Sequence, residues 1–377
     1  MRIILIGNYL PDQQESMQRF AQMLDTGFRN AGFRTEIWRP NVVFCVGPQR
    51  ANVGIRKWLG YVDKWLLFPL VLRWRLSSKS EHAEETRFHI CDHSNAPYLN
   101  HLPINQTSIT CHDVLAIRGG LGYSDAYVPA SPFGKLLQRW ILTSLTKAKR
   151  LAAVSHFTLG QLQELTSSRN ADQRKWRVIH NAFNAEFSPM AATQAQFLLE
   201  QIKFDFLTPY LLHVGSRLVR KNRFLLLDMA ALLGERWQGN ICFAGEPVDL
   251  ALWKHAESLG LRERVISMVK PDHDILVALY SLCFTFVFPS FSEGFGWPVI
   301  EAQACGAPVI ASNVEPMPEV SGGAALHADP ANAQEFADAL LALMDNSART
   351  ALIQKGFANC HRFDGEKILA AYIKLLQ

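Results

Sequence analysis

The stretch FVFPSFSEGFGWPVIEAQACGAPVIAS, residues 286–312, decides the fold class. It opens with an apolar run that has the length and composition of a buried strand and that breaks at Pro289. A glycine-rich loop follows, and then a helix with Pro298 at its first position and Gly306 at its end. A second apolar run, PVIAS, comes next. A strand, a helix and another strand in this order predict a parallel sheet covered by helices.

The same alternation runs along the rest of the chain. In the first half, six expected strands lie at 3–8, 35–40, 88–93, 108–113, 151–156 and 177–181. In the second half, six more lie at 210–216, 241–246, 265–270, 284–290, 308–312 and 324–329. Because no literal sequence repeat accompanies this doubling, we expect two doubly wound α/β sheets rather than a repeat array. Ligands of such sheets bind beyond the carboxyl ends of the strands, so we expect the function there.

Length and composition indicate a globular protein of two domains. The 377 residues exceed the size at which a single core stops growing. With 49% hydrophobic and 19% charged residues, the chain can bury substantial cores, which excludes wholesale disorder. We expect one domain over residues 1–190 and another over 205–358, with a hinge near 188–209. A final helix, 360–377, is expected to pack back on the first domain.

Net charge limits the classes of binding partner, and cysteine usage indicates the cellular compartment. A formal charge of +4 is too small for a nucleic-acid footprint, although it suits diphosphates or membrane surfaces. The seven cysteines lie far apart without a CxxC pair, as expected for reduced thiols in a cytoplasmic protein. The apolar run in MRIILIGN, residues 1–8, is shorter than a signal-peptide core and is expected to form a first buried strand.

The glycine-rich loop has the features of a site for an anion or a polar sugar. Gly294 and Gly296 let backbone amides approach a ligand, and the start of the following helix adds unpaired amides. Glu293 and Glu301 frame the loop, and this spacing suits one carboxylate on sugar hydroxyls and the other on a ribose diol. The alternative is structural: Glu301 in the first turn would complement the helix dipole, and Glu293 would be solvated.

The segment closely resembles the signature of glycosyltransferase family four, whose members are retaining enzymes of GT-B fold with a Glu, seven residues, Glu motif. HVGSRLVRKN, residues 213–222, resembles the family's segment whose basic residues hold the donor diphosphate, and VEPMPEVSGGAALHADP, residues 314–330, also fits the pattern. The family's usual Arg directly after the glycine is absent, because Ser216 stands there. Arg217 and Arg220 therefore remain alternatives for the diphosphate contact.

The resemblance extends weakly into the first half of the chain. SITCHD, residues 108–113, resembles the family's strand that ends in a His near the reacting sugar, and Asp113 would either orient this His or cap the next helix. The resemblance thus implies catalytic roles for His112, Lys221 and Glu293. It implies donor binding by Gly215, Arg217, Arg220, Lys221, Glu293, Gly294, Phe295, Gly296, Trp297 and Glu301.

We expect neither a metal nor another cofactor. Preplaced Lys and Arg side chains act most strongly on the charge that develops on the departing nucleotide, so they would replace a metal. PDHD, residues 271–274, resembles a metal-binding Asp triplet, but it directly precedes a helical pattern. Asp272 or Asp274 is therefore expected to cap that helix.

Residues 55–76 suggest a further partner. A helical projection places six apolar residues on one face, with Arg56, Lys57 and Lys64 elsewhere and Pro69 interrupting the pattern. Such a helix suits a membrane interface, although packing on its own sheet is an equal alternative. The six residues are Ile55, Trp58, Leu59, Val62, Trp65 and Leu66.

These features together predict a GT-B glycosyltransferase with two Rossmann-like domains facing a central cleft. We expect a hexose to move from a nucleotide diphosphate sugar, with GDP-mannose as the leading donor and a UDP-sugar otherwise, to a glycan or lipid-linked acceptor in surface polysaccharide or glycoconjugate synthesis. The location would be cytoplasmic, with a membrane contact through 55–76 on the inner face. The rivals are a phosphorylase or epimerase of the same fold and a catalytically silent scaffold, which intact Lys221, Glu293 and Glu301 argue against. Nicotinamide chemistry is set aside because no GxGxxG follows the first strand.

Overall fold

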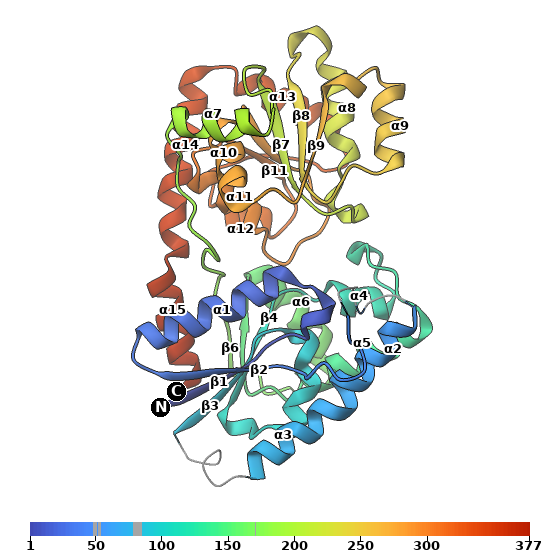
Figure 1. Ribbon diagram of the computed structural model, residues 1–377, viewed down its shortest axis with the longest axis vertical. Helices are drawn as coiled ribbons and strands as arrows, with labels where there is room; N and C mark the ends of the chain where they lie inside the picture. The colour runs from blue at the N-terminus through green and yellow to red at the C-terminus, as the bar shows by residue number, and fades with distance from the viewer. Residues whose placement is uncertain (48–50, 52–53, 78–84, 170) are drawn as a thin grey trace. The chain divides into compact units, whose positions relative to one another are not determined.

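The computed structural model describes residues 1–47, 51, 54–77, 85–169 and 171–377. The chain forms two compact units (Figure 1). Unit 1 consists of Met1–Asn184 together with Gly365–Gln377, and unit 2 consists of Ala185–Asp364. Each unit contains one parallel six-stranded sheet, as the alternation of apolar runs predicts.

The sheet of unit 1 has the strand order β2-β1-β3-β4-β5-β6. Every neighbouring pair is parallel. The order reverses between β1 and β3, which makes this pair the switch point of a doubly wound sheet. The strands are β1 (Arg2–Ile6), β2 (Arg34–Trp38), β3 (Thr86–Ile90), β4 (Thr107–Cys111), β5 (Arg150–Ala153) and β6 (Lys175–Val178).

The sheet of unit 2 has the order β12-β11-β10-β7-β8-β9, which is the order of a dinucleotide-binding fold. Its switch point lies between β7 and β10, which pair in parallel. The strands are β7 (Tyr210–Gly215), β8 (Asn240–Gly245), β9 (Val265–Val269), β10 (Thr285–Phe288), β11 (Val309–Ser312) and β12 (Leu326–Ala328).

Helices connect the strands in both units. Unit 1 has α1 (Glu15–Asn30), α2 (Gly54–Val62), a π-helical turn η2 (Asp63–Leu67), α3 (Phe68–Ser77), a 3₁₀ segment η3 (His93–His101), α4 (Leu115–Leu121), α5 (Pro132–Leu145), α6 (His156–Thr166) and α15 (Gly365–Leu376). Unit 2 has α7 (Ala192–Gln201), a 3₁₀ turn η7 (Val219–Lys221), α8 (Phe224–Leu233), α9 (Leu250–Ser258), α10 (His273–Leu282), α11 (Trp297–Ala304), α12 (Met317–Ser321), α13 (Ala333–Ala342) and α14 (Asn346–Cys360).

The last helix completes the core of unit 1. α15 packs against α1, β3, β4 and β5. Its Tyr372 is fully buried, and the Tyr372 hydroxyl lies 3.1 Å from Oγ1 of Thr110 in β4. The guanidinium of Arg87 donates from Nε to the carbonyl of Leu376 over 2.9 Å. Unit 1 is therefore built from two segments that are far apart in the sequence.

Two corrections concern helix boundaries. Residues 192–201 lie within the hinge predicted near 188–209, but they form α7, and α7 packs against α10 within unit 2. Glu301 lies in the second turn of α11 rather than in the first, because the helix begins at Trp297. Among the described helices, none is both long enough and apolar enough to cross a membrane.

Candidate functional site

The carboxyl ends of β7 and β10 meet at the switch point of unit 2. β7 ends at Gly215, and the chain then forms η7, which carries Arg220 and Lys221. The loop after β10 returns beside this turn, since the amide of Phe291 donates to the carbonyl of Arg220 over 2.8 Å. Backbone pairing thus places the loop that precedes α11 against the basic turn.

Three charged side chains gather where these two loops touch. Nζ of Lys221 lies 2.6 Å from Oε1 of Glu293, and NH1 of Arg220 lies 2.7 Å from Oε2 of the same carboxylate. Arg220 also donates to the carbonyl of Ser292 over 2.9 Å. Lys221 and Glu293 are buried, and the ammonium of Lys221 lies 4.8 Å from the centre of the Phe288 ring. Two cations therefore share one carboxylate within ion-pairing distance.

The ion pairs control the ionisation of Glu293. Burial alone would raise the pKa of the Glu293 carboxyl, but the charges of Lys221 and Arg220 outweigh burial and lower this pKa to about 2. Glu293 is therefore ionised at neutral pH. For Lys221, burial lowers the pKa of the ammonium group, while the charge of Glu293 opposes this effect. The carboxylate thus keeps both cations in place where burial alone would disfavour their charge.

Gly215 leaves room for His213, with Lys221 in contact range beside it. A Cβ at this position would lie 3.1 Å from Nε2 of His213 and 3.6 Å from Cδ of Lys221. On the neighbouring strand, Gly245 has φ +116°, and a Cβ there would lie 2.7 Å from the carbonyl oxygen of Gly215. Side chains at Gly215 and Gly245 would crowd the adjoining strand ends at the edge where the charges gather.

The two candidate arginines occupy different places. Arg220 joins Lys221 and Glu293, whereas the amide of Arg217 donates to Oε2 of Glu246 over 2.8 Å. The Arg217 guanidinium lies 3.5 Å from the same Glu246 oxygen, and its side chain is half exposed. The geometry therefore groups Arg220, and not Arg217, with the buried charges.

The second carboxylate of the motif lies within α11. Glu301 is 8% exposed and accepts a hydrogen bond over 3.1 Å from the hydroxyl of Tyr280 in α10. Gly296, the N-cap residue of α11, has φ +94°, and a Cβ there would approach the Met317 side chain to 2.6 Å. The left-handed turn before the helix thus needs a glycine on two grounds.

The remaining predicted donor residues lie in the same loop and at the start of the helix. Gly294 follows Glu293 directly. Phe295 is buried, and its ring centre lies 5.9 Å from that of Trp297 and 5.6 Å from that of Phe363. Phe295 therefore anchors the loop by packing. Trp297, the first residue of α11, is half-buried.

The Asp triplet at 271–274 lies at a helix start, as predicted. Asp272 occupies the N-cap position of α10, and Asp274 lies in its first turn. The Asp272 side chain makes no capping hydrogen bond to the helix. Asp272 therefore supports the start of α10 through its extended backbone and through its negative charge near the positive end of the helix dipole.

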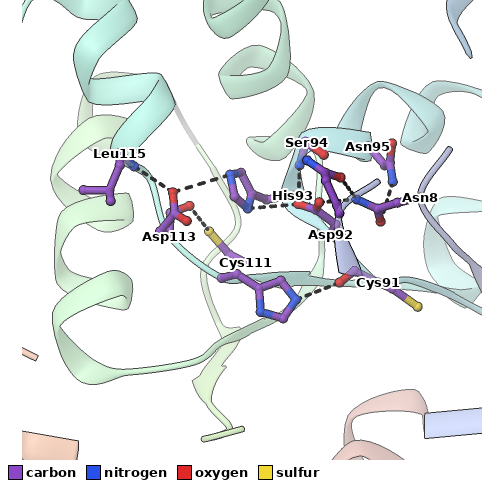
Figure 2. A network of polar contacts seen from close by, with 11 residues as sticks. Asn8, Cys91, Asp92, His93, Ser94, Asn95, Cys111, Asp113 and Leu115 are labelled. Carbon is purple, nitrogen blue, oxygen red and sulfur yellow. Dashed lines mark hydrogen bonds and ion pairs between the residues drawn. The ribbon is translucent and has the colours of Figure 1, made fainter. Parts of the chain in front are cut away.

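Unit 1 has a buried polar cluster at its own switch point (Figure 2). Asn8 follows β1 and donates from Nδ2 to Oδ2 of Asp92, which follows β3, over 2.5 Å. The other oxygen of Asp92 accepts from the amide of Ser94 and lies 3.3 Å from Nδ1 of His93. Burial raises the pKa of Asp92, but His93, His112, the Ser94 amide and Asn8 together lower it below its ordinary value.

His112 lies at the end of β4, beside this cluster. Its Nε2 is 2.9 Å from the carbonyl oxygen of Cys91, so this nitrogen carries the proton in the neutral ring. Burial lowers the pKa of His112, and Asp92 only partly offsets that effect. Asp113 accepts from the amide of Leu115 over 3.0 Å, which supports the capping alternative for this residue.

Comparison with known proteins shows the family of unit 2. Residues 198–358 match the family model described as Glycosyl transferases group 1. The matched stretch lies within unit 2 and covers less than half of the chain. O-antigen chain mannosyltransferase B of Escherichia coli is 32% identical to the chain over 240 residues. This stretch covers 62% of the chain and 61% of that relative, so the chain spans less than two thirds of its length.

Solved structures show that the likeness in fold extends over both units. WaaG, a glycosyltransferase involved in lipopolysaccharide biosynthesis, superposes with a TM-score of 0.73 at 14% identity and covers 100% of each chain. HepE of Anabaena, in complex with UDP and glucose, superposes with a TM-score of 0.67 at 17% identity, covering 99% of this chain and 98% of that one. At such identities the likeness shows the fold, which confirms the predicted GT-B class.

Four polar residues of these two sites are not identified by the sequence patterns. Asn8, Asp92 and Glu246 each stand at the end of an expected strand run, where ligand-facing residues of a doubly wound sheet are expected. Their positions at strand ends could therefore have identified them as candidate site residues. Tyr280 lies within a helix and carried no such signal, because its contact with Glu301 depends on how α10 packs beside α11.

Proposed function

We propose that this glycosyltransferase is a retaining enzyme whose unit 2 binds the diphosphate of a nucleotide sugar with Lys221 and Arg220. The observation that carries the proposal is the buried group in which these two cations share the carboxylate of Glu293 at the switch point. A diphosphate would supply the negative charge that this group lacks. As the anomeric bond breaks, charge on the departing nucleotide grows, and cations already in place stabilise it without a metal.

Glu293 and Glu301 would divide the recognition of the donor. In the proposal, Glu293 accepts hydrogen bonds from sugar hydroxyls beside the diphosphate, and Glu301 accepts them from the ribose diol. The Tyr280 hydroxyl supports the second role, since it holds one Glu301 oxygen from the side of α10. His112 and the Asn8–Asp92 cluster would face the transferred sugar and the acceptor, because they lie at the corresponding edge of unit 1.

For the donor and acceptor we propose mannose from GDP-mannose, or otherwise a hexose from a UDP-sugar, and a growing surface polysaccharide or lipid-linked glycan. The support is the 32% identity to an O-antigen chain mannosyltransferase. The GT-B likeness to HepE, crystallised with UDP and glucose, supports a nucleotide-diphosphate donor in general. We further propose a cytoplasmic enzyme that meets a membrane through residues 55–76.

The test is nucleotide release from GDP-, UDP- and ADP-sugars with EDTA present. We expect slow release from one donor in the absence of acceptor, and loss of this release in Lys221→Ala. Lys254→Ala, which removes an exposed lysine from α9 of the same unit, serves as the matched control. Dependence on a divalent metal would contradict the proposed role of the cations. Absence of both release and nucleotide binding across the panel would favour a silent scaffold.

A further inference from the structure

An apolar groove crosses the surface of unit 1 between two helical elements. One wall is α2 with η2, and the other is α5. The cavity has a volume of about 670 Å³, within the range of roughly 300–1,000 Å³ typical of ligand pockets. Its lining carries almost no polar surface and consists of Trp58, Tyr61, Val62, Trp65, Leu66, Phe133, Leu136, Leu137 and Trp140.

Aromatic contacts hold the two walls together. The Phe133 ring centre lies 4.8 Å from that of Trp58 and 5.5 Å from that of Tyr61. Farther along, the ring centre of Trp65 lies 5.3 Å from that of Trp140. Each pair joins a residue of α2 or η2 to one of α5, so aromatic packing fixes the spacing of the two walls. Large apolar groups nevertheless remain in solvent: Trp58 is 52% exposed and Leu136 is 63% exposed.

The π-helical turn explains why the groove differs from the single apolar face predicted for residues 55–76. The amide of Phe68 donates to the carbonyl of Asp63, five residues earlier, just before Pro69. Asp63 is buried and accepts hydrogen bonds from the Tyr9 hydroxyl and the amide of Cys45.

The predicted face therefore divides between two environments. Leu59 turns toward a small core with Tyr9, Cys45 and Ala51, while Ile55 stays exposed outside the groove. The other four predicted residues line the groove, together with α5, which the sequence did not associate with them.

The helices that line the groove carry mostly basic side chains, and Asp12, whose charge acts on Tyr61, is ion-paired with Lys64. Asp63 is the only acidic residue within 54–77, it is buried, and the segment 132–150 contains none. Two basic side chains of this segment have partners within unit 1. Arg56 donates a hydrogen bond to the carbonyl of Val46, and Lys64 forms an ion pair with Asp12. The basic side chains on the lining helices are Lys57, whose Nζ lies 5.8 Å from the centre of the Tyr61 ring, and the exposed Lys135 and Arg139 of α5.

We propose that this groove binds a hydrocarbon chain of an anionic membrane lipid, with the surrounding lysines and arginines on the lipid phosphates. Indole and phenol rings favour the boundary between hydrocarbon and water, and nearby cations are attracted to an anionic leaflet. A second copy of this chain fits the surface less well, since its own basic side chains would face those of its partner. The inference rests on the proposed function for the lipid-linked acceptor, which such a contact would bring to the enzyme.

The first test is flotation of the full chain with vesicles of phosphatidylcholine, with and without phosphatidylglycerol. We expect binding to the anionic vesicles, and a loss of about tenfold or more in the partition coefficient of Trp58→Ser/Leu136→Ser. The matched control is Leu207→Ser/Leu250→Ser, which removes two exposed leucines from unit 2 and should bind as the parent does. Lys135→Glu/Arg139→Glu should lose the preference for phosphatidylglycerol.

A variant that fills the groove distinguishes lipid binding inside the groove from nonspecific binding to an exposed apolar surface. Val62→Trp adds apolar surface but occupies the groove, so it should weaken binding; equal or tighter binding would overturn the groove as the site. Failure of the parent to float with anionic vesicles would overturn the membrane contact itself. Vesicle-free self-association that Trp58→Ser/Leu136→Ser abolishes in sedimentation velocity would assign the surface to a second copy instead.

Nucleotide release without vesicles keeps the two proposals apart. It should be unchanged in Trp58→Ser/Leu136→Ser, because the groove lies outside unit 2. Release in the parent without flotation would refute the lipid site alone, whereas flotation without release would refute the donor chemistry alone. Circular dichroism melts of each variant confirm folding, and the charge-reversal variant provides a second reading if the serine variant does not fold.

Discussion

The ammonium group of Lys221 lies 2.6 Å from the carboxylate of Glu293, although 72 residues separate them in the chain. The strand order brings them together: β7 and β10 are neighbours in the sheet, and each is followed by one of the two loops. Because the order reverses between these strands, their connections leave in opposite directions and leave room for a ligand between them. The pair thus marks where the sheet itself offers a site.

Replacement of the two cations that contact Glu293 should slow the transfer more than replacement of Arg217. We expect Lys221→Ala and Arg220→Ala each to reduce turnover by about 10²-fold or more, because in the proposed function these cations stabilise charge on the departing diphosphate. Arg217→Ala should change turnover by about twofold or less, since the Arg217 guanidinium is half exposed beside Glu246. Steady-state nucleotide release measures all three, and a larger effect of Arg217→Ala would reverse the assignment of the arginines.

Replacement of Glu301 should weaken nucleotide binding. We expect Glu301→Ala to cost about 1–3 kcal/mol in nucleotide affinity, through loss of charge-assisted hydrogen bonds to ribose. Tyr280→Phe should reproduce a smaller part of this loss, since it frees the Glu301 oxygen that Tyr280 holds. Titration calorimetry with the nucleoside diphosphate measures both, with Glu257→Ala in α9 as the exposed control. Parent-like affinity in Glu301→Ala would remove this residue from the site.

Acid should remove the stabilisation that Glu293 provides to unit 2. Its pKa is lowered to about 2 in the folded protein, so its contribution is fully present above the unfolded pKa of about 4.3 and declines as the pH falls toward 2. The shift corresponds to about 3 kcal/mol at neutral pH. Glu293→Gln should therefore be less stable than the parent at pH 7, and the difference should narrow below about pH 4.5.

Amide exchange of β7 and β10 measures this effect in unit 2 alone. A difference between parent and Glu293→Gln that stays constant from pH 7 to pH 3 would contradict the ion-pair explanation.

Loss of the Tyr372 hydroxyl should destabilise unit 1. Its oxygen lies 3.1 Å from Thr110, whose hydroxyl also lies 2.9 Å from Nε2 of the buried His89. We expect Tyr372→Phe to lower the free energy of unfolding by about 1 kcal/mol. The measurement is amide exchange in β4, and Tyr123→Phe on the exposed surface is the control. Parent-like protection of β4 would show that the hydrogen bond adds nothing to the docking of α15.

The sequence was sufficient for the strands of both sheets, because apolar runs between polar loops report burial directly. It was also sufficient for the loop and helix around Gly296 and Pro298, whose backbone requirements only a few residue types meet. The π-helical turn at Asp63–Leu67 was not predictable from apolar periodicity. It depends on a buried carboxylate that accepts hydrogen bonds from a loop about twenty residues earlier.

Some site residues could likewise be predicted from the sequence, and others depend on tertiary structure. Lys221 and Glu293 were identifiable as a group because the resemblance named both, while the choice between Arg217 and Arg220 needed the turn geometry that places only Arg220 on Glu293. The contact of Tyr280 with Glu301 and the joining of α5 to α2 arise from helix packing. Packing of this kind depends on tertiary neighbours, which periodicity along one helix does not reveal.

The two-segment construction of unit 1 has a consequence for synthesis on the ribosome. The sheet of this unit is translated first, yet α15, whose Tyr372 packs on Thr110, is made only after the whole of unit 2. At about 5 to 20 residues per second, the nascent unit 1 waits roughly ten to forty seconds with its α15 site open. During that interval the rings of His89 and of Phe20 in α1, whose centres lie 5.3 and 6.1 Å from that of Tyr372 in the finished fold, lack this neighbour.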